Sequence, residues 1–192
     1  MVKILAFAGS NKEQSWNRKL LNIAVAGAAQ SAEVTVVDLR DYPMPLFCET
    51  LEAAEGMPAS ARQFKKMMLE HDALMIASPE YNSAFSPLLK NTIDWVSRSE
   101  EKDEPGLAAY RGKVAVLMST SPGGLGGSRG LVFLRMLLAN MGVIVLPEQQ
   151  CIPQAFNAFT AEGALQDESK QTAVLQLGVR LAEVTAQLNS KH

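Results

Sequence analysis

The sequence predicts a three-layer, doubly wound α/β fold around a five-stranded parallel sheet, and two observations support this prediction. Five short apolar runs are nearly continuous rather than alternating in polarity, as in parallel strands that are buried on both faces. Longer segments of helical period separate these runs, so strands and helices alternate along the chain. Right-handed crossovers then place helices on both faces of the sheet.

The five expected strands are rich in β-branched and aliphatic residues: Lys3–Ala8, Glu33–Asp38, Ala73–Ser78, Lys113–Thr120 and Val143–Leu146. The five expected helices are the longer segments that follow them: Ser15–Gln30, Pro58–His71, Ser86–Arg98, Arg129–Met141 and about Leu165–Asn189. In the last helix apolar residues recur every three or four positions, which gives one stripe that can face a sheet. Segment 41–57 is expected to be an irregular excursion.

Composition restricts the class of protein. The chain has 192 residues, which favours a single domain over residues 1–192, and its 18 Lys+Arg against 20 Asp+Glu leave a formal net charge of −2. That balance argues against a strongly basic nucleic-acid binder. Two cysteines and two histidines without a cluster predict free thiols and no metal site. No stretch has the length of a membrane span or the form of a signal peptide, so we expect a cytoplasmic protein.

The loop after the first expected strand, 9–17, joins a buried strand to the start of a helix. Successive backbone N–H groups and the positive end of the helix dipole favour an anion there. Ser10, Ser15 and Asn17 add neutral donors, and Lys12 adds a positive charge. The loop matches neither GxGxxG nor GxxxxGK[ST], so a terminal phosphate monoester suits it better than a dinucleotide. The alternative is an ordinary helix N-cap by Ser15.

Two further loops follow the third and fourth expected strands. Loop 78–87 carries two prolines that stiffen it, and its backbone amides could face a flat heterocycle with Tyr81 as an aromatic wall. Loop 119–129 has four glycines within five residues, which let a backbone approach a ligand closely. The alternatives are a rigid turn with a packed tyrosine and a flexible surface loop. In a doubly wound sheet all three loops lie at the carboxyl ends of strands, where ligands bind.

The ordered segments GSNKEQSWN, SPEYNSAFSPLLKNTIDW and STSPGGLGGSR resemble the NADPH-dependent FMN reductase family, the flavodoxin-like group that includes quinone, azo-dye and chromate reductases. The resemblance covers nearly the whole chain, from the first strand through the fourth helix, and SPEYN is its most specific motif. It implies a flavodoxin-like fold with strand order 2-1-3-4-5 and one FMN per subunit.

The resemblance also implies which residues bind the cofactor. By position, the FMN phosphate would be held by Ser10, Lys12, Ser15, Trp16 and Asn17. The segment that borders the isoalloxazine ring would be Pro79, Glu80, Tyr81 and Asn82. The second wall of the site would be Ser119, Gly123 and Gly124. Family members often have arginine where Lys12 stands, so a bidentate phosphate contact becomes a single point charge here.

The chemistry implied by the resemblance belongs to the flavin. FMN would accept hydride at N5 from NADPH or NADH and pass two electrons to quinones, azo compounds, free flavin or similar acceptors in a ping-pong mechanism. No catalytic side chain and no metal is then expected, and the partners are small molecules rather than nucleic acid or a membrane. A homodimer or homotetramer is also implied. The helix 86–98 would contribute to its interface, because it carries more apolar surface than one sheet face needs.

Two other functions use the same loops. A flavodoxin-type electron carrier would lack nicotinamide chemistry of its own, but such carriers usually have a strongly acidic surface and a Thr-rich phosphate loop. A net charge of −2 and a Ser-Asn-Lys loop fit that class poorly. A flavin-binding sensor without significant turnover is the third possibility.

Overall fold

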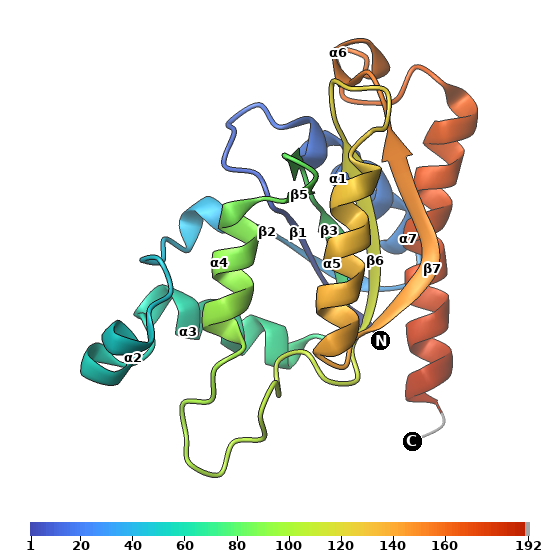
Figure 1. Ribbon diagram of the computed structural model, residues 1–192. Coiled ribbons are helices and arrows are strands. Elements are labelled where there is room, and N and C mark those ends of the chain that lie inside the picture. Colours follow the sequence, from blue (N-terminus) through green and yellow to red (C-terminus); the bar gives the residue numbers. More distant parts are fainter. Residues whose placement is uncertain (191–192) are drawn as a thin grey trace.

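A computed structural model describes residues 1–190 (Figure 1). Its centre is a five-stranded parallel sheet in the order β2-β1-β3-β6-β7, which confirms the expected topology. These strands are β1 (Lys3–Ala8), β2 (Glu33–Asp38), β3 (Ala73–Ala77), β6 (Val114–Thr120) and β7 (Ile144–Ile152). A separate antiparallel pair is formed by β4 (Glu80–Tyr81) and β5 (Ala84–Phe85). The helices are α1 (Trp16–Ala28), α2 (Glu49–Glu55), α3 (Ala59–Glu70), α4 (Pro87–Val96), α5 (Ser128–Asn140), α6 (Ala155–Ala158) and α7 (Glu168–Asn189), with a 3-10 turn at Leu39–Asp41.

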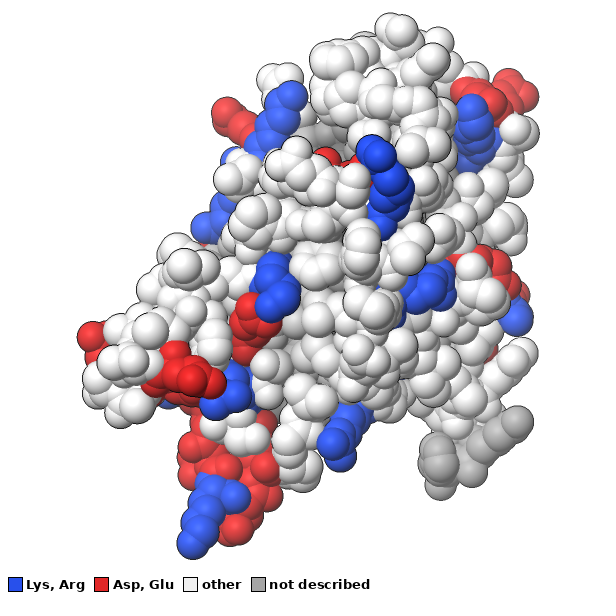
Figure 2. Space-filling model, in the orientation of Figure 1, with Lys and Arg blue, Asp and Glu red and all other residues white. Residues whose placement is uncertain are grey.

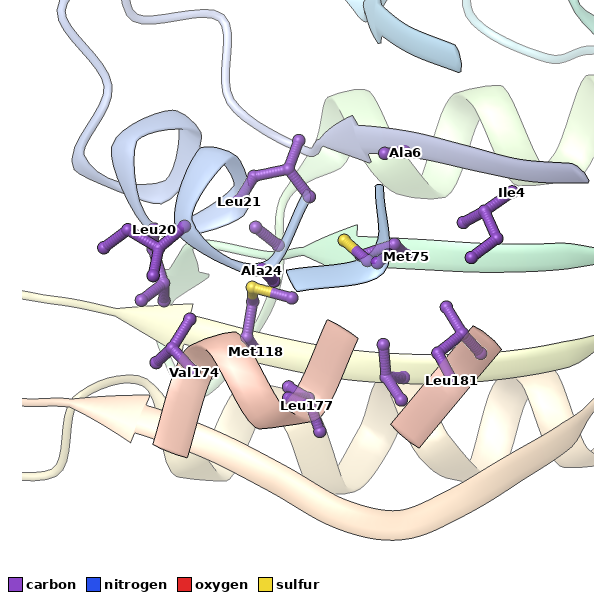
Figure 3. Packing of buried hydrophobic residues seen from close by; sticks show 14 of the residues in the cluster. Ile4, Ala6, Leu20, Leu21, Ala24, Met75, Met118, Val174, Leu177 and Leu181 are labelled. Carbon is purple, nitrogen blue, oxygen red and sulfur yellow. The ribbon is translucent and has the colours of Figure 1, made fainter. Parts of the chain in front are cut away.

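Helices cover both faces of the sheet, as the crossover rule requires. On one face, α1 and α7 pack over the central strands, and on the other face α3, α4 and α5 do so. Figure 3 shows the first core from close by, with side chains of α1, the strands and α7 directed toward one another. Its labelled members are Ile4, Ala6, Leu20, Leu21, Ala24, Met75, Met118, Val174, Leu177 and Leu181.

The helix ends follow the chemistry of their terminal residues. Ser15 caps α1 by accepting a hydrogen bond from the Arg18 backbone N–H, and Ser86 caps α4 in the same way. Pro87 occupies the first position of α4, where its missing N–H has no cost. After α5, Gly142 adopts a φ of 83°, which fits glycine after the end of a helix.

The packing of α1 against α7 depends on two glycines. A Cβ at Gly178 of α7 would overlap the carbonyl oxygen of Ala24, and one at Gly27 of α1 would overlap the carbonyl oxygen of Leu175. Both helices therefore approach backbone to backbone, which brings them close enough to share one face of the sheet. The two glycines lie 151 positions apart in the sequence, so no local pattern predicts that they bring the two helices together.

Three expectations from the sequence are wrong in detail. The fifth strand continues to Ile152 instead of ending at Leu146. Two extra residues of β7 form a bulge between Val145 and Gln149, opposite Ala115 and Leu117 of β6, and pairing resumes beyond Pro147. Segment 41–57 is not irregular throughout, since it contains α2. The two-residue pairing of β4 with β5 was also not expected within the loop after β3.

Much of the apolar surface of α4 is buried within the chain. Trp95 is fully buried, donates a hydrogen bond from Nε1 to the Pro45 carbonyl at 2.7 Å, and meets Phe47 edge to face at 5.0 Å. Segment 41–57 therefore covers the outer side of α4. Three of the exposed apolar side chains lie together on α5: Val132, Phe133 and Met136.

Charge on the surface is mixed in sign. Figure 2 shows acidic and basic side chains side by side at the lower left, over α2 and the loop between α4 and β6, and smaller groups of both signs in the upper part. Within residues 1–190, no helix is long and apolar enough to cross a membrane.

We expect Gly178→Ala to lower the free energy of unfolding by about 1–3 kcal/mol, because the added methyl group meets backbone atoms of α1 that cannot rotate away. Urea denaturation followed by far-UV circular dichroism measures the change. Gly106→Ala is the matched control, since a Cβ there meets nothing within 4 Å, and its effect should stay within about 0.5 kcal/mol. Equal effects of the two variants would contradict the close crossing.

Candidate functional site

The three predicted loops meet at the carboxyl edge of the sheet. The backbone N–H of Gly9 after β1 donates to the Ala77 carbonyl of β3, and that of Ser78 donates to the Met118 carbonyl of β6, both at 2.9 Å. The hydroxyl of Ser86 donates to the Gly9 carbonyl, which locks the first loop to the start of α4. The loops are thus held as one rigid group.

The first loop brings a cluster of predicted residues to the start of α1. Ser10 and Ser15 are buried, and the Ser10 hydroxyl accepts a hydrogen bond from the Lys12 backbone N–H at 3.3 Å. The Lys12 ammonium lies 4.3 Å from the centre of the Trp16 ring, which is a cation–π distance. The positive end of a 13-residue helix and one lysine therefore meet here, and this arrangement suits an anion.

The Asn17 side chain is bonded within the protein. Its amide nitrogen donates to the Thr120 carbonyl and its amide oxygen accepts from the Thr120 backbone N–H, both at 3.0 Å. The side chain is only 5% exposed within this pair of bonds. Asn17 therefore ties the first turn of α1 to the end of β6, and its side chain is not turned toward an open anion site.

The second loop is shaped as a hairpin. Pro79 is buried, and the two-residue turn at Asn82 and Ser83 has φ values of 51° and 68°, so both residues are left-handed as in a type I′ turn. Asparagine tolerates this conformation better than most residues. The hairpin leaves Tyr81 and Asn82 exposed to solvent. Tyr81 is thus an aromatic side chain on a rigid support rather than a packed one.

Glu80 connects the second loop to α5. Its carboxylate accepts hydrogen bonds from the Arg129 guanidinium at 3.0 and 3.2 Å and from the Gly130 backbone N–H at 3.0 Å. The residue that precedes α5 is Gly127, which has no side chain to cap the helix. The Glu80 carboxylate takes over that role and complements the helix dipole. Its side chain is 10% exposed, so it is directed at α5 rather than at open surface.

The third loop uses its glycines in other places than the sequence suggested. A Cβ at Gly126 would overlap the backbone of Ile152, and one at Gly127 would overlap the Ser119 hydroxyl, whereas Gly124 faces open space. Ser119 is fully buried beneath Gly127, and its hydroxyl has no hydrogen-bond partner. Gly126 and Gly127 therefore allow close contact with other parts of this chain. Gly124, rather than Ser119, lies at the surface of the loop.

Gly123 connects this loop to a fourth one, which sequence reasoning missed. The Gly123 carbonyl accepts from the Gln154 backbone N–H at 3.2 Å, and the Ser121 carbonyl accepts from that of Ala155 at 3.0 Å. These bonds bring α6 to the same edge, where Phe156 contacts Trp16 edge to face at 4.6 Å. The predicted last strand ended at Leu146, six residues before the end of β7 at Ile152. The sequence therefore contained no sign that α6 lies at the carboxyl edge of the sheet.

The two thiols do not supply a nucleophile to the edge. Burial raises the pKa of Cys151, near the end of β7, so the neutral thiol dominates at neutral pH. Cys48 precedes α2 and is exposed, with its pKa lowered by the backbone N–H groups of Leu51 and Thr50. Both cysteines are free, as expected.

We expect Glu80→Ala to lower the free energy of unfolding by about 1–3 kcal/mol, because the Gly130 N–H and the start of α5 lose their acceptor. Arg129→Ala should cost less than about 1 kcal/mol, since the Arg129 side chain is 59% exposed and its ion pair is screened. Glu80→Gln keeps an acceptor and should lie between the two. Urea denaturation of the three variants checks this order, and an Arg129→Ala variant as unstable as Glu80→Ala would contradict it.

Comparisons with known proteins agree with this geometry. A family model described as NADPH-dependent FMN reductase matches residues 2–157. The chain is 32% identical over 186 residues to an NAD(P)H-dependent FMN reductase of Pseudomonas aeruginosa, covering 93% of this chain and 96% of that protein. It is 30% identical over 195 residues to an NADPH:quinone oxidoreductase of Arabidopsis thaliana, covering 100% and 95%.

A solved structure shows the same fold. The flavoenzyme NAD(P)H:(acceptor) oxidoreductase of Paracoccus denitrificans matches with a TM-score of 0.81 and 24% identity over 97% of this chain and 98% of that one. The family model spans most of the chain, and the two relatives align over nearly their whole length. The chain therefore belongs to the NADPH-dependent FMN reductase family of oxidoreductases.

Proposed function

We propose that this chain is a single-domain, cytoplasmic enzyme that contains FMN and transfers electrons from NADPH or NADH to small acceptors by a ping-pong mechanism. Quinones, azo compounds and free flavin are the acceptor classes. The observation that carries the proposal is one rigid edge of the sheet at which an anion site at the start of α1 lies beside an exposed aromatic hairpin. Family membership supports the same cofactor and donor.

The donor set at this edge fits FMN. A phosphate monoester would be held by the first turn of α1 with Ser10, Lys12, Ser15 and Trp16. A flat ring would lie between the hairpin, with Pro79, Tyr81 and Asn82, and the loop that carries Gly123 and Gly124. Three residues would support the site without contacting FMN through their side chains: Asn17, Glu80 and Ser119. The side chains of Asn17 and Glu80 are bonded to other loops, and Ser119 is fully buried.

The side chains bind and orient rather than donate protons. When bound, FMN supplies two-electron chemistry by accepting hydride and passing electrons to a second substrate. The Glu80 carboxylate is occupied by Arg129 and Gly130, so it stays an acceptor and supports the loop. The exposed Tyr81 discriminates between acceptors by stacking more than by hydrogen bonding, which supports a broad range of flat acceptors.

Self-association as a homodimer or homotetramer is part of the proposal. Exposed apolar side chains on adjacent turns of α5 support it: Val132, Phe133 and Met136. Such a surface on one helix is typical of contact between protein chains.

The direct test is to purify the protein with FMN and mix it anaerobically with NADPH and then with NADH. We expect a flavin absorbance that bleaches with at least one donor and returns when a quinone is added. A flavin that binds but is bleached by neither donor would contradict the enzyme and favour a carrier or a sensor. Failure to bind FMN at any concentration would remove the cofactor assignment.

Lys12→Ala should weaken FMN binding about 3- to 10-fold, because one charge-assisted contact to the phosphate is lost at an exposed position. The loss should shrink as salt is added, since the contact is electrostatic. Fluorescence titration of the FMN-free protein measures the dissociation constant. Lys19→Ala, one turn along α1, removes the same charge away from the loop and should leave FMN affinity unchanged. An unaltered affinity in Lys12→Ala would exclude Lys12 from the phosphate site.

A further inference from the structure

An exposed aromatic surface borders the candidate site, and one of its residues, Phe156, has no role in the proposed FMN contacts. We define the aromatic rim as Lys12, Trp16 and Phe156. The Lys12 ammonium lies 4.3 Å from the Trp16 ring centre, and Phe156 meets the same ring at 4.6 Å with an interplanar angle of 76°. Phe156 is 70% exposed, so most of its ring faces solvent.

The rim is held in place before any ligand arrives. Gln154 adopts left-handed backbone angles, φ 53° and ψ 47°, at the start of α6. The backbone N–H groups of Gln154 and Ala155 donate to carbonyls of the glycine-rich loop. Trp16 is the first residue of α1, whose position is fixed by Asn17 and Thr120. An aromatic side chain that stays exposed does not gain the free energy of burial. When its support is rigid, it loses little conformational entropy on binding a ligand, which favours such groups in binding sites.

The rim lies between two loops of the candidate site. Figure 1 shows α6 above the carboxyl ends of β6 and β7, beside the loop that precedes α5. Backbone bonds from Gln154 to Gly123 and from Ala155 to Ser121 join it to that loop, and the Phe156–Trp16 contact joins it to the anion site. Phe156 therefore lies at the border of the candidate site, between the glycine-rich loop and the start of α1.

We propose that the rim binds the adenine end of NAD(P)H, with the base stacked on Phe156. This inference rests on the proposed function, in which NADPH or NADH reduces the bound flavin. Phe156 offers an exposed aromatic face, and a planar base stacks on such a face. Stacking is tolerant of substituents, so the rim serves NADH and NADPH alike and does not select between them.

The test uses three donors with FMN-loaded protein and one quinone at a fixed concentration. NADH and NADPH carry the adenine half, whereas reduced nicotinamide mononucleotide lacks it. For Phe156→Ala we expect kcat/KM for NADH and NADPH to fall roughly 5- to 30-fold, the effect of losing one base–aromatic stack, while kcat/KM for the mononucleotide stays unchanged. Phe156→Tyr should restore the wild-type ratio, because the ring is kept.

Leu69→Ala is the control. Leu69 is also an exposed apolar residue, but it lies near the end of α3, at the amino end of β3 rather than at the carboxyl edge of the sheet. We expect this variant to leave the ratio of kcat/KM between NADH and the mononucleotide at the wild-type value.

A binding measurement gives a second readout that does not depend on turnover. Calorimetric titration of FMN-loaded protein with adenosine diphosphate should show binding in the wild type and a loss of roughly 5- to 30-fold in affinity in Phe156→Ala. Bound FMN keeps adenosine diphosphate out of the proposed phosphate site at the start of α1.

The outcomes separate the rim from the wider function. If Phe156→Ala lowers kcat/KM equally for all three donors, or weakens FMN binding alone, the rim belongs to the flavin or to the nicotinamide and the inference is wrong. If adenosine diphosphate binds wild type and Phe156→Ala equally, it is also wrong. If neither donor reduces wild-type protein, the proposed function fails, and the diphosphate titration still decides whether the rim binds adenine.

Discussion

Two hydrogen bonds between the Asn17 side chain and the backbone of Thr120 set the distance from α1 to the end of β6. They lie in a buried place, where an unmade bond to either backbone group would be costly. This connection joins the loop that precedes α1 to the glycine-rich loop that follows β6. The second loop is held in the same way: the Ser86 hydroxyl donates to the Gly9 carbonyl, and the Glu80 carboxylate accepts from the Gly130 N–H. Side chains thus hold backbone segments in register, and the backbone presents the binding surface.

This arrangement explains why few side chains in the site have free reactive groups. The buried polar residues of the three loops serve the scaffold, whereas Lys12, Tyr81 and Phe156 remain exposed along its margin. A scaffold of that kind suits a cofactor that brings its own chemistry, because the protein has only to orient two flat molecules against each other. The nearly balanced charge of the chain does not oppose the approach of an anionic nicotinamide donor.

Local sequence patterns predicted most of the framework. Strand β1 and strand β2 have the expected bounds, and α1, α3, α4 and α5 differ from expectation by three residues or fewer at each end. These elements are long or strongly apolar, so periodicity suffices to find them. The end of β7 was missed because Pro147, Glu148 and two glutamines interrupt its apolar pattern, and only the partner strand β6 stabilises it. Helix α2 was missed because its pattern is short, and α4 was assigned surplus surface that Pro45 and Phe47 in fact cover.

The sequence by itself determined the main strands and helices, the three loops at the carboxyl edge of the sheet and the family resemblance, because each depends on residues that are near one another in the chain. The tertiary structure decided which side chains within those loops are free. Asn17, Glu80 and Ser119 are engaged or covered by partners 103, 50 and 8 positions away, at Thr120, Gly130 and Gly127. Phe156 reaches the start of α1 only because β7 returns the chain to the same edge. Contacts across such separations arise from packing and strand order, which no local pattern encodes.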